Sequence, residues 1–293
     1  MNRSSLPTIT SSLRTLSRQG FRARPRVGQL ERRIIDPEVL DAGAKQTLID
    51  ELYATHEQIF AGVSKSSFAA YVVNSPAERT RIEVYRVDGR VVGYQAVHTF
   101  VRTIEGERWV VIRAEQGKLP AYRRDANARL LIAEVLRACV CYPRARKAFL
   151  GCLVHPSAYI ALARVAPQVF PSPAAPTPAP IARAMAELAR SFELEQVAES
   201  GDHDCREVGW ITLETRADRR SWAARRDELT HFYMSANPGY INGEGLLTLV
   251  PISLSGLVQG SFTHALRSSS RKLARARVQL DQVRERSASA RLA

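Results

Sequence analysis

Three consecutive β-rich runs, separated by tight-turn signals, constrain the fold of this chain most strongly. Residues 81–87 alternate apolar and polar side chains and end at Asp88-Gly89, a pair that favours the positive φ angles of a two-residue β-hairpin. A second run covers 90–101, and another glycine-containing turn precedes a third run at 109–114. The pattern therefore predicts three adjacent antiparallel strands. The side chains expected in the core of the sheet are Val84, Val92 and Tyr94.

The hydrophobic period changes from two to about 3.6 residues after this meander. Apolar residues recur at helical spacing over 121–141, and the segment 115–123 joins the third strand to that helix. A buried strand is predicted at 147–154, and a short helix at 157–166 follows it. Backbone N–H groups at the start of a helix are free to bind an anion, so the strand-to-helix loop is the expected place for chemistry.

This order of elements resembles the superfamily of Gcn5-related N-acetyltransferases (GNAT). In that family a meander leads to a fourth strand, and a loop reading Arg/Gln-x-x-Gly-x-Gly/Ala before the next helix binds the pyrophosphate of coenzyme A. The resemblance covers roughly residues 40–170. It implies an α/β (α+β) fold in which helices flank a mixed, mostly antiparallel sheet. A helical and β-stranded C-terminal extension is expected to follow that core.

The loop motif is altered in this chain. Arg123 matches the first motif position and Ala128 the last, but Ala126 stands where the family has its key glycine. An alanine methyl group crowds an approaching phosphate and restricts the backbone. The resemblance implies a donor site formed by Arg123, Arg124, Asp125, Ala126, Asn127 and Ala128.

The resemblance also implies candidates for proton transfer. A carboxylate or histidine near the end of the fourth strand acts as base in this family, and Glu115 is the first candidate. His98 is the second, since its ordinary pKa lies near neutrality. Tyr159, on the helix after the fifth strand, is the candidate acid for the leaving thiolate. The alternatives are an ion pair for Glu115 with Arg113 or Lys118, a sheet-surface role for His98, and simple packing for Tyr159.

These assignments predict an enzyme that moves an acyl group from a thioester to an amine. No tightly bound cofactor is expected, and the donor co-substrate is either acyl-CoA or the acyl-phosphopantetheine of an acidic acyl carrier protein. The alternative class is a non-catalytic binding or scaffold protein that kept the fold and lost the donor loop. The sequence contains no Gly-x-Ser-x-Gly elbow, Walker loop or Rossmann glycine pattern to support a different reaction.

The net charge of +13 lies almost entirely at the two ends of the chain. Residues 1–30 and 261–293 each carry +6, which leaves +1 on the remaining body. A basic C-terminal helix at 267–286 therefore predicts contact with an anionic membrane surface or another polyanion. Nucleic-acid binding is not expected, because the body is nearly neutral and has no basic-aromatic stripe. The N-terminal arm also matches an organelle transit peptide in composition.

The four cysteines indicate an intracellular protein, and the cytoplasm is the expected location, because they are too few for a disulfide scaffold. Their spacing with two histidines invites a zinc interpretation. Several of them fall in apolar runs where small buried thiols are common, so no metal site is expected. The residues considered were Cys139, Cys141, Cys152, His155, His203 and Cys205.

The predicted organisation has four parts. A basic arm at 1–30 precedes an acyltransferase core at 36–170, which Asp36-Pro37 opens as a helix cap. A proline-rich connection and an extension at 171–266 pack on that core, and a basic tail covers 267–293. Further expected elements are a helix at 43–62, whose Tyr53, His56 and Glu57 could face the acceptor, one helix from Asp218 through Tyr233, and a strand at 246–253.

Overall fold

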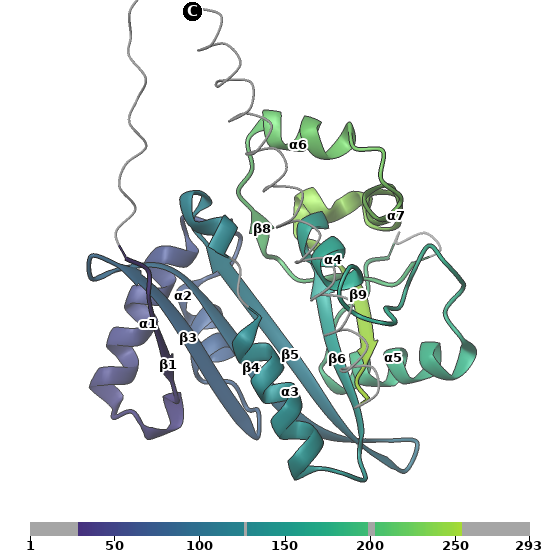
Figure 1. The fold of residues 1–293 in the computed structure, drawn as a ribbon, viewed down its shortest axis with the longest axis horizontal. Helices are drawn as coiled ribbons and strands as arrows, with labels where there is room; N and C mark the ends of the chain where they lie inside the picture. Colours follow the sequence, from purple (N-terminus) through teal and green to yellow (C-terminus); the bar gives the residue numbers. More distant parts are fainter. Residues whose placement is uncertain (1–28, 126–127, 199–202, 254–293) are drawn as a thin grey trace, which may run out of the picture.

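The computed structural model describes residues 29–125, 128–198 and 203–253. Its centre is one seven-stranded sheet in the order β1-β3-β4-β5-β6-β9-β7, and β2 pairs with β8 in a separate two-stranded sheet (Figure 1). The strands are β1 (Glu31–Ile35), β2 (Phe60–Ala61), β3 (Arg79–Val87), β4 (Arg90–Ile104), β5 (Glu107–Lys118), β6 (Arg146–Leu153), β7 (Cys205–Glu207), β8 (Ile211–Thr212) and β9 (Glu244–Pro251).

Helices flank this sheet, as the sequence predicts. The α-helices are α1 (Ala42–His56), α2 (Lys65–Phe68), α3 (Arg129–Cys141), α4 (Pro156–Ala163), α5 (Ala179–Ser191), α6 (Arg216–Ala223) and α7 (Glu228–Ala236). Short 3-10 segments are η1 (Pro37–Val39), η3 (Pro120–Asp125) and η4 (Pro238–Asn242), and η2 (Ala69–Val73) is a π-helical turn. The predicted fold class, a mixed and mostly antiparallel sheet flanked by helices, is confirmed.

The predicted hairpin forms at Asp88-Gly89. Asp88 has φ 50° and Gly89 has φ 77°, so the two-residue turn takes the geometry that this residue pair favours. The turn joins β3 to β4 in antiparallel register. Val84, Val92 and Tyr94 are all buried, so this prediction is confirmed.

Among the described strands of the main sheet, β5 and β6 form the one parallel pair, which covers only part of both strands. It extends from Trp109 opposite Arg146 to Ile112 opposite Phe149. Beyond that point the register ends, and the two strands spread apart toward their carboxyl ends in Figure 1.

The two faces of the sheet have different covers. Helices α1 and α2 pack on one face, where Ile82, Val84, Tyr94 and Ala96 form a buried cluster with them. Helices α3, α4 and α7 pack on the other face, around Val97, Val110, Ile112 and Phe149. Alternation along each strand separates these two sets, because successive side chains point to opposite faces.

Three helix predictions need correction. The helix predicted at 43–62 ends at His56, and Phe60 belongs to β2. The helix predicted at 121–141 begins only at Arg129, because Pro120–Asp125 adopts a separate 3-10 turn. The helix predicted from Asp218 through Tyr233 is two helices, and the second begins where the Asp227 side chain accepts a hydrogen bond from Thr230 N–H. An N-cap residue starts a new helix within a stretch of helical periodicity. The spacing of apolar residues alone does not reveal such a break.

The region after the proline-rich segment adds strands to the same sheet. β9 pairs with β6, and β7 pairs with β9 in turn. No helix in the described part of the chain is long and apolar enough to cross a membrane. The basic arm at 1–28 and the tail beyond 253, including the predicted helix at 267–286, lie outside the described residues.

The segment from Gly209 to β8 packs directly on the loop after β2. Gly62 has φ 94°, and a Cβ atom added to it would lie 2.2 Å from the Gly209 carbonyl oxygen. Gly209 has φ 74°, yet a Cβ atom there would meet nothing within 4 Å. The Gly209 backbone therefore occupies the place that a side chain at position 62 would need. A side chain at position 209 would instead enter open space.

These two glycines form a matched pair for a stability test. Gly62→Ala should lower the free energy of unfolding by about 3 kcal/mol or more, because a positive-φ penalty of about 1–2 kcal/mol is joined by overpacking of about 1–3 kcal/mol. Gly209→Ala should incur only the φ penalty. Urea unfolding of both variants measures the difference, and equal losses would contradict the close contact.

Candidate active site

Three buried polar side chains on neighbouring strands form a connected chain of hydrogen bonds. His98 Nδ1 lies 2.9 Å from Thr80 Oγ1, and His98 Nε2 lies 2.5 Å from Glu115 Oε1. The structure thus brings together the two predicted bases, His98 and Glu115. Glu115 Oε2 is buried and has no hydrogen-bond partner among the described residues.

The strand register explains why these side chains meet. Thr80 on β3 stands opposite His98 on β4, and His98 stands opposite Arg113 on β5. Paired residues of adjacent strands point to the same face, and Glu115 returns to that face two residues after Arg113. This is the face that α1 and α2 cover.

Arg113 and Tyr71 complete the cluster. The Arg113 guanidinium carbon lies 5.4 Å from the Tyr71 ring centroid and 4.7 Å from that of Phe192. The Tyr71 ring also lies 6.0 Å from the His98 ring. Glu115 therefore pairs with His98. The alternative ion pair between Glu115 and Arg113 is not found among the described residues.

Tyr71 covers the cluster from the π-helical turn η2. Within that turn Ala69, Val72 and Val73 are buried, while Tyr71 is 36% exposed. A π-turn shifts the register of the side chains on a helix, and such turns are frequent at functional sites. Trp210 also packs edge-on against Tyr71, with ring centroids 5.9 Å apart.

The cluster lies where β5 and β6 separate. Ile112 is the last β5 residue paired with β6, and Arg113 and Glu115 follow it on the face covered by α1 and α2. On β6, burial raises the pKa of the Cys152 thiol to about 11, although the Arg113 and Arg206 guanidiniums act in the opposite direction. Cys152 is thus a neutral thiol at physiological pH and a poor nucleophile.

Two of the three α1 residues that were expected to face the acceptor are instead engaged in packing and hydrogen bonding. His56 is buried among aromatic rings, and the Tyr53 hydroxyl donates to the Val63 carbonyl at 2.9 Å. Glu57 caps the end of α1 and is exposed. His56 and Tyr53 therefore stabilise the packing of α1 on α2 and β4.

The predicted donor loop is described in part. The 3-10 turn η3 ends at Asp125, and Ala128 is the N-cap residue of α3. Arg123 is exposed, and its Nε donates weakly to the Lys118 carbonyl at 3.5 Å. Arg124 belongs to η3, while Ala126 and Asn127 lie outside the described residues. The described part of the loop ends two residues before the N-cap of α3, and the free N–H groups of a helix start can bind an anion.

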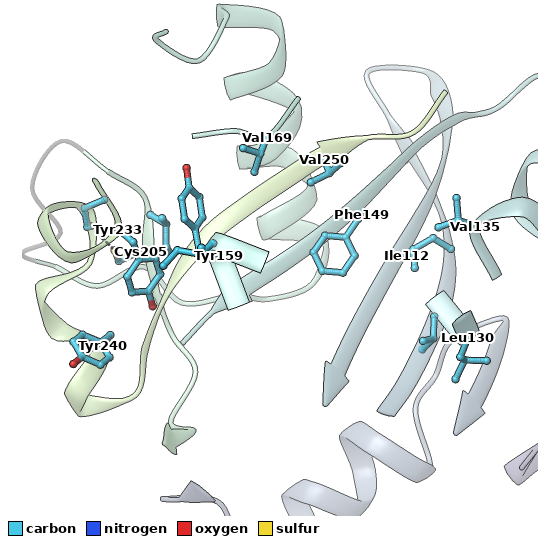
Figure 2. Close-up of a cluster of buried hydrophobic side chains, with 14 of the residues drawn as sticks. Ile112, Leu130, Val135, Phe149, Tyr159, Val169, Cys205, Tyr233, Tyr240 and Val250 are labelled. Atoms are coloured by element: carbon cyan, nitrogen blue, oxygen red, sulfur yellow. Dashed lines mark hydrogen bonds between the residues drawn. The ribbon is translucent and has the colours of Figure 1, made fainter. Parts of the chain in front are cut away.

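Tyr159 faces away from the base. Its side chain is fully buried, and its hydroxyl donates to the Pro171 carbonyl at 2.9 Å. It belongs to the cluster on the α3 and α4 face, with Tyr233 and Phe149 (Figure 2). Since His98 and Glu115 lie on the opposite face, the structure does not bring Tyr159 together with them.

A second polar group surrounds the start of α4. His155 Nδ1 lies 2.6 Å from Ser157 Oγ and accepts from Ser157 N–H, and its Nε2 lies 2.7 Å from Glu214 Oε1. Because His155 is the N-cap of α4, these contacts complete a helix cap and fix the segment before α6. Among the residues that the structure describes, no three His, Cys, Asp or Glu side chains form a metal-binding group.

A surface hollow lies elsewhere. It has a volume of about 620 Å³ and lies between the proline-rich segment and α7. Its lining includes Ser172, Arg226, His231 and Phe232, and none of the residues of the polar cluster.

No protein-family model matches this chain, and no curated protein sequence matches it. Solved structures do resemble it. A conserved protein of unknown function from Enterococcus faecalis matches with 11% identity and a TM-score of 0.31, over 47% of this chain and 32% of that one. This chain therefore spans about a third of the length of that relative.

Two of the other similar structures are acetyltransferases. NAA60 of Arabidopsis thaliana, in complex with acetyl-CoA, is 18% identical with a TM-score of 0.31, over 48% of this chain and 87% of that one. The ribosomal-protein-S18-alanine N-acetyltransferase of Escherichia coli is 12% identical with a TM-score of 0.29, over 76% of this chain and 96% of that one.

Sequence reasoning missed Tyr71 and Thr80 and treated Arg113 only as a partner of Glu115. Thr80 and Arg113 become recognisable once the register is known, since both stand opposite His98. The spacing of Arg113 and Glu115, two residues apart on one strand, was the available signal that both point to one face.

Proposed function

We propose that this chain is a divergent Gcn5-related N-acetyltransferase that moves an acyl group from a thioester to an amine. The observation that carries the proposal is the Thr80-His98-Glu115 hydrogen-bond chain, which ends in a free carboxylate oxygen beside the point where β5 and β6 separate. The attacking amine loses a proton during acyl transfer, and a carboxylate held by histidine at that place can accept it.

In the proposed reaction Glu115 accepts the proton that the amine loses as its nitrogen attacks the thioester carbonyl. The new C–N bond forms and the C–S bond breaks. The leaving thiolate takes up one proton from solvent and Glu115 releases its proton to solvent, so that protons balance over the cycle. His98 orients the Glu115 carboxylate, and Thr80 orients His98. These two are positioning residues, because they act on the reacting atoms through Glu115.

The donor is proposed to place its phosphate groups at the start of α3. Exposed Arg123 and the adjacent Arg124 supply positive charge there, and the free N–H groups of the first helical turn supply donors. Either coenzyme A or the phosphopantetheine of an acyl carrier protein presents this chemistry. The alanine at position 126 leaves less room for a pyrophosphate and favours a carrier protein, which has only one phosphate at that point.

A donor-binding measurement tests this proposal. Replacing both Arg123 and Arg124 by alanine should weaken binding of acetyl-CoA or an acyl carrier protein at least tenfold in calorimetry, because charge-assisted hydrogen bonds contribute about 1.5–3 kcal/mol each. Arg137→Ala with Arg144→Ala is the matched control. It removes the same charge from exposed positions on and just after α3.

Ala126→Gly should improve binding of coenzyme A in particular. If neither donor binds the wild-type chain, and Ala126→Gly does not restore binding, the chain is a scaffold protein that has lost the donor site. Equal weakening in the control would mean that general charge, and not the loop, attracts the donor.

A further inference from the structure

One charged side chain in the cluster has no role in the chemistry proposed above. Arg113 is 7% exposed, and its guanidinium forms no hydrogen bond or ion pair with residues 29–125, 128–198 or 203–253. Buried arginines are ordinarily paired, because a buried charge without a partner costs several kcal/mol. The surroundings of Arg113 must therefore explain why a charged side chain is buried there.

Aromatic contacts account for only part of that cost. The rings of Tyr71 and Phe192 lie within cation–π distance of the guanidinium, and such contacts contribute about 0.5–2 kcal/mol each. These contacts do not use the guanidinium N–H groups as conventional hydrogen-bond donors, and Nε is buried without a partner among the described residues. The planar set of N–H donors therefore remains available to an anion with two oxygens.

An anion bound by Arg113 would lie close to the proposed base, Glu115. Arg113 and Glu115 are two residues apart on β5 and share one face, which sets their Cα atoms about 6.6 Å apart along the strand. A molecule whose amine reaches Glu115 can therefore place a second group at Arg113. The Tyr71 ring lies against both His98 and Arg113, which favours a small acceptor.

We propose that Arg113 binds a carboxylate of the acceptor, so that the acceptor is a small free amino acid and not a neutral amine. The inference rests on the proposed acyl transfer at Glu115, and it adds the class of substrate. The Arg113 fork holds the carboxylate through two N–H donors while the amine of the same molecule faces Glu115.

Paired acceptors test the inference. Release of free thiol from acetyl-CoA and octanoyl-CoA is measured with glycine and L-alanine, and with glycinamide and L-alaninamide. Wild-type kcat/KM should be at least tenfold higher for the acids than for the amides. Amides have the less basic amine and hence more of the reactive free base, so basicity alone predicts the opposite order.

Arg113→Met should abolish this preference by lowering kcat/KM for the acids alone. Arg113→Lys should retain part of it, and it replaces Arg113→Met if the latter fails to fold. Arg102→Met is the matched control. Its guanidinium carbon lies 4.8 Å from the same Phe192 ring, but Arg102 belongs to β4 and lies beside Glu78, with 3.9 Å between the charged groups. Arg102→Met should keep the preference.

A binding measurement separates this inference from the proposed reaction. Glycine and L-alanine without any donor should raise the melting temperature of the wild type more than their amides do, and Arg113→Met should remove that difference. If it does so while no thiol is released, the carboxylate site stands and acyl transfer fails. Equal shifts with acids and amides, or an acid preference that survives in Arg113→Met, overturn the assignment even where thiol release proves the transfer.

Discussion

Glu115→Gln is expected to lower kcat for acyl transfer by at least about a hundredfold, since positioned general bases contribute about 10²–10⁴. Glutamine has nearly the same shape and can still contact His98, but it cannot accept a proton from the amine. Donor binding should remain within about twofold of the wild type, because Glu115 lies on the sheet and not in the strand-to-helix loop. Thiol release and donor calorimetry on the same preparations measure the two quantities.

The matched control for Glu115 lies on the same strand. Glu107 begins β5, is exposed, and forms an ion pair with Arg146. Glu107→Gln should change neither kcat nor donor binding, because exposed ion pairs contribute little. A Glu115→Gln variant with wild-type kcat would remove the base from the proposed reaction. Transfer by a pre-deprotonated amine would then be the simpler explanation.

The parts of the fold that were predicted correctly depend on local chemistry. Asp88-Gly89 specifies its hairpin because the turn needs two positive φ angles, and the alternation on either side assigns Val84 and Tyr94 to the core. The Asp36 cap before Pro37 is likewise local, and the cap is found as predicted. Features of this kind require no knowledge of distant residues. The core itself begins earlier than predicted, because β1 at Glu31–Ile35 pairs with β3.

The parts that were missed depend on contacts between distant residues. β9 pairs with β6 although about ninety residues separate them. The sequence of neither strand indicates which strand it pairs with. The same limit applies to the site. His98 and Glu115 were selected separately, one from its chemistry and the other from its place at the end of the predicted strand. That predicted end was wrong, because β5 continues to Lys118. The hydrogen bond between His98 and Glu115, and the part that Thr80 plays, follow from a register that only the folded sheet defines.

Tyr159 shows the reverse case. A family pattern suggested it as the acid, but the offset along α4 turns its hydroxyl to Pro171. A residue type at nearly the right place in the sequence therefore does not guarantee the right face, because one position along a helix rotates a side chain by about 100°.

His56 should make the folded chain lose stability between pH 6.5 and pH 4. Burial lowers the pKa of His56 from its ordinary value of 6.5 to about 4, and its side chain is 1% exposed. Its ring is surrounded by aromatic rings, and its Nδ1 lies 2.9 Å from the Tyr94 hydroxyl. The ring contacts are with Tyr53, Phe60, Phe68, Tyr94 and Trp210.

The sign of the effect follows from proton uptake. Above pH 6.5 the imidazole is neutral in both states and contributes no pH dependence. Between pH 6.5 and about 4 the unfolded chain binds a proton that the folded chain does not, so the free energy of unfolding falls as the pH falls. Below about pH 4 both states are protonated and the loss is complete. A pKa difference of about 2.5 corresponds to about 3 kcal/mol at 1.36 kcal/mol per unit.

His56→Gln isolates this contribution. Glutamine does not titrate and can still form a hydrogen bond to the Tyr94 hydroxyl, whereas phenylalanine would leave that buried hydroxyl without a partner. Urea unfolding at pH 7.5, 5.5 and 4 should show a loss in the wild type that is about 3 kcal/mol larger than in His56→Gln. The aromatic rings could oppose this loss by cation–π attraction to a protonated imidazole, at about 0.5–2 kcal/mol per contact. If that attraction exceeds the cost of desolvation, the two proteins will lose stability in parallel, and His56 will titrate near its ordinary pKa.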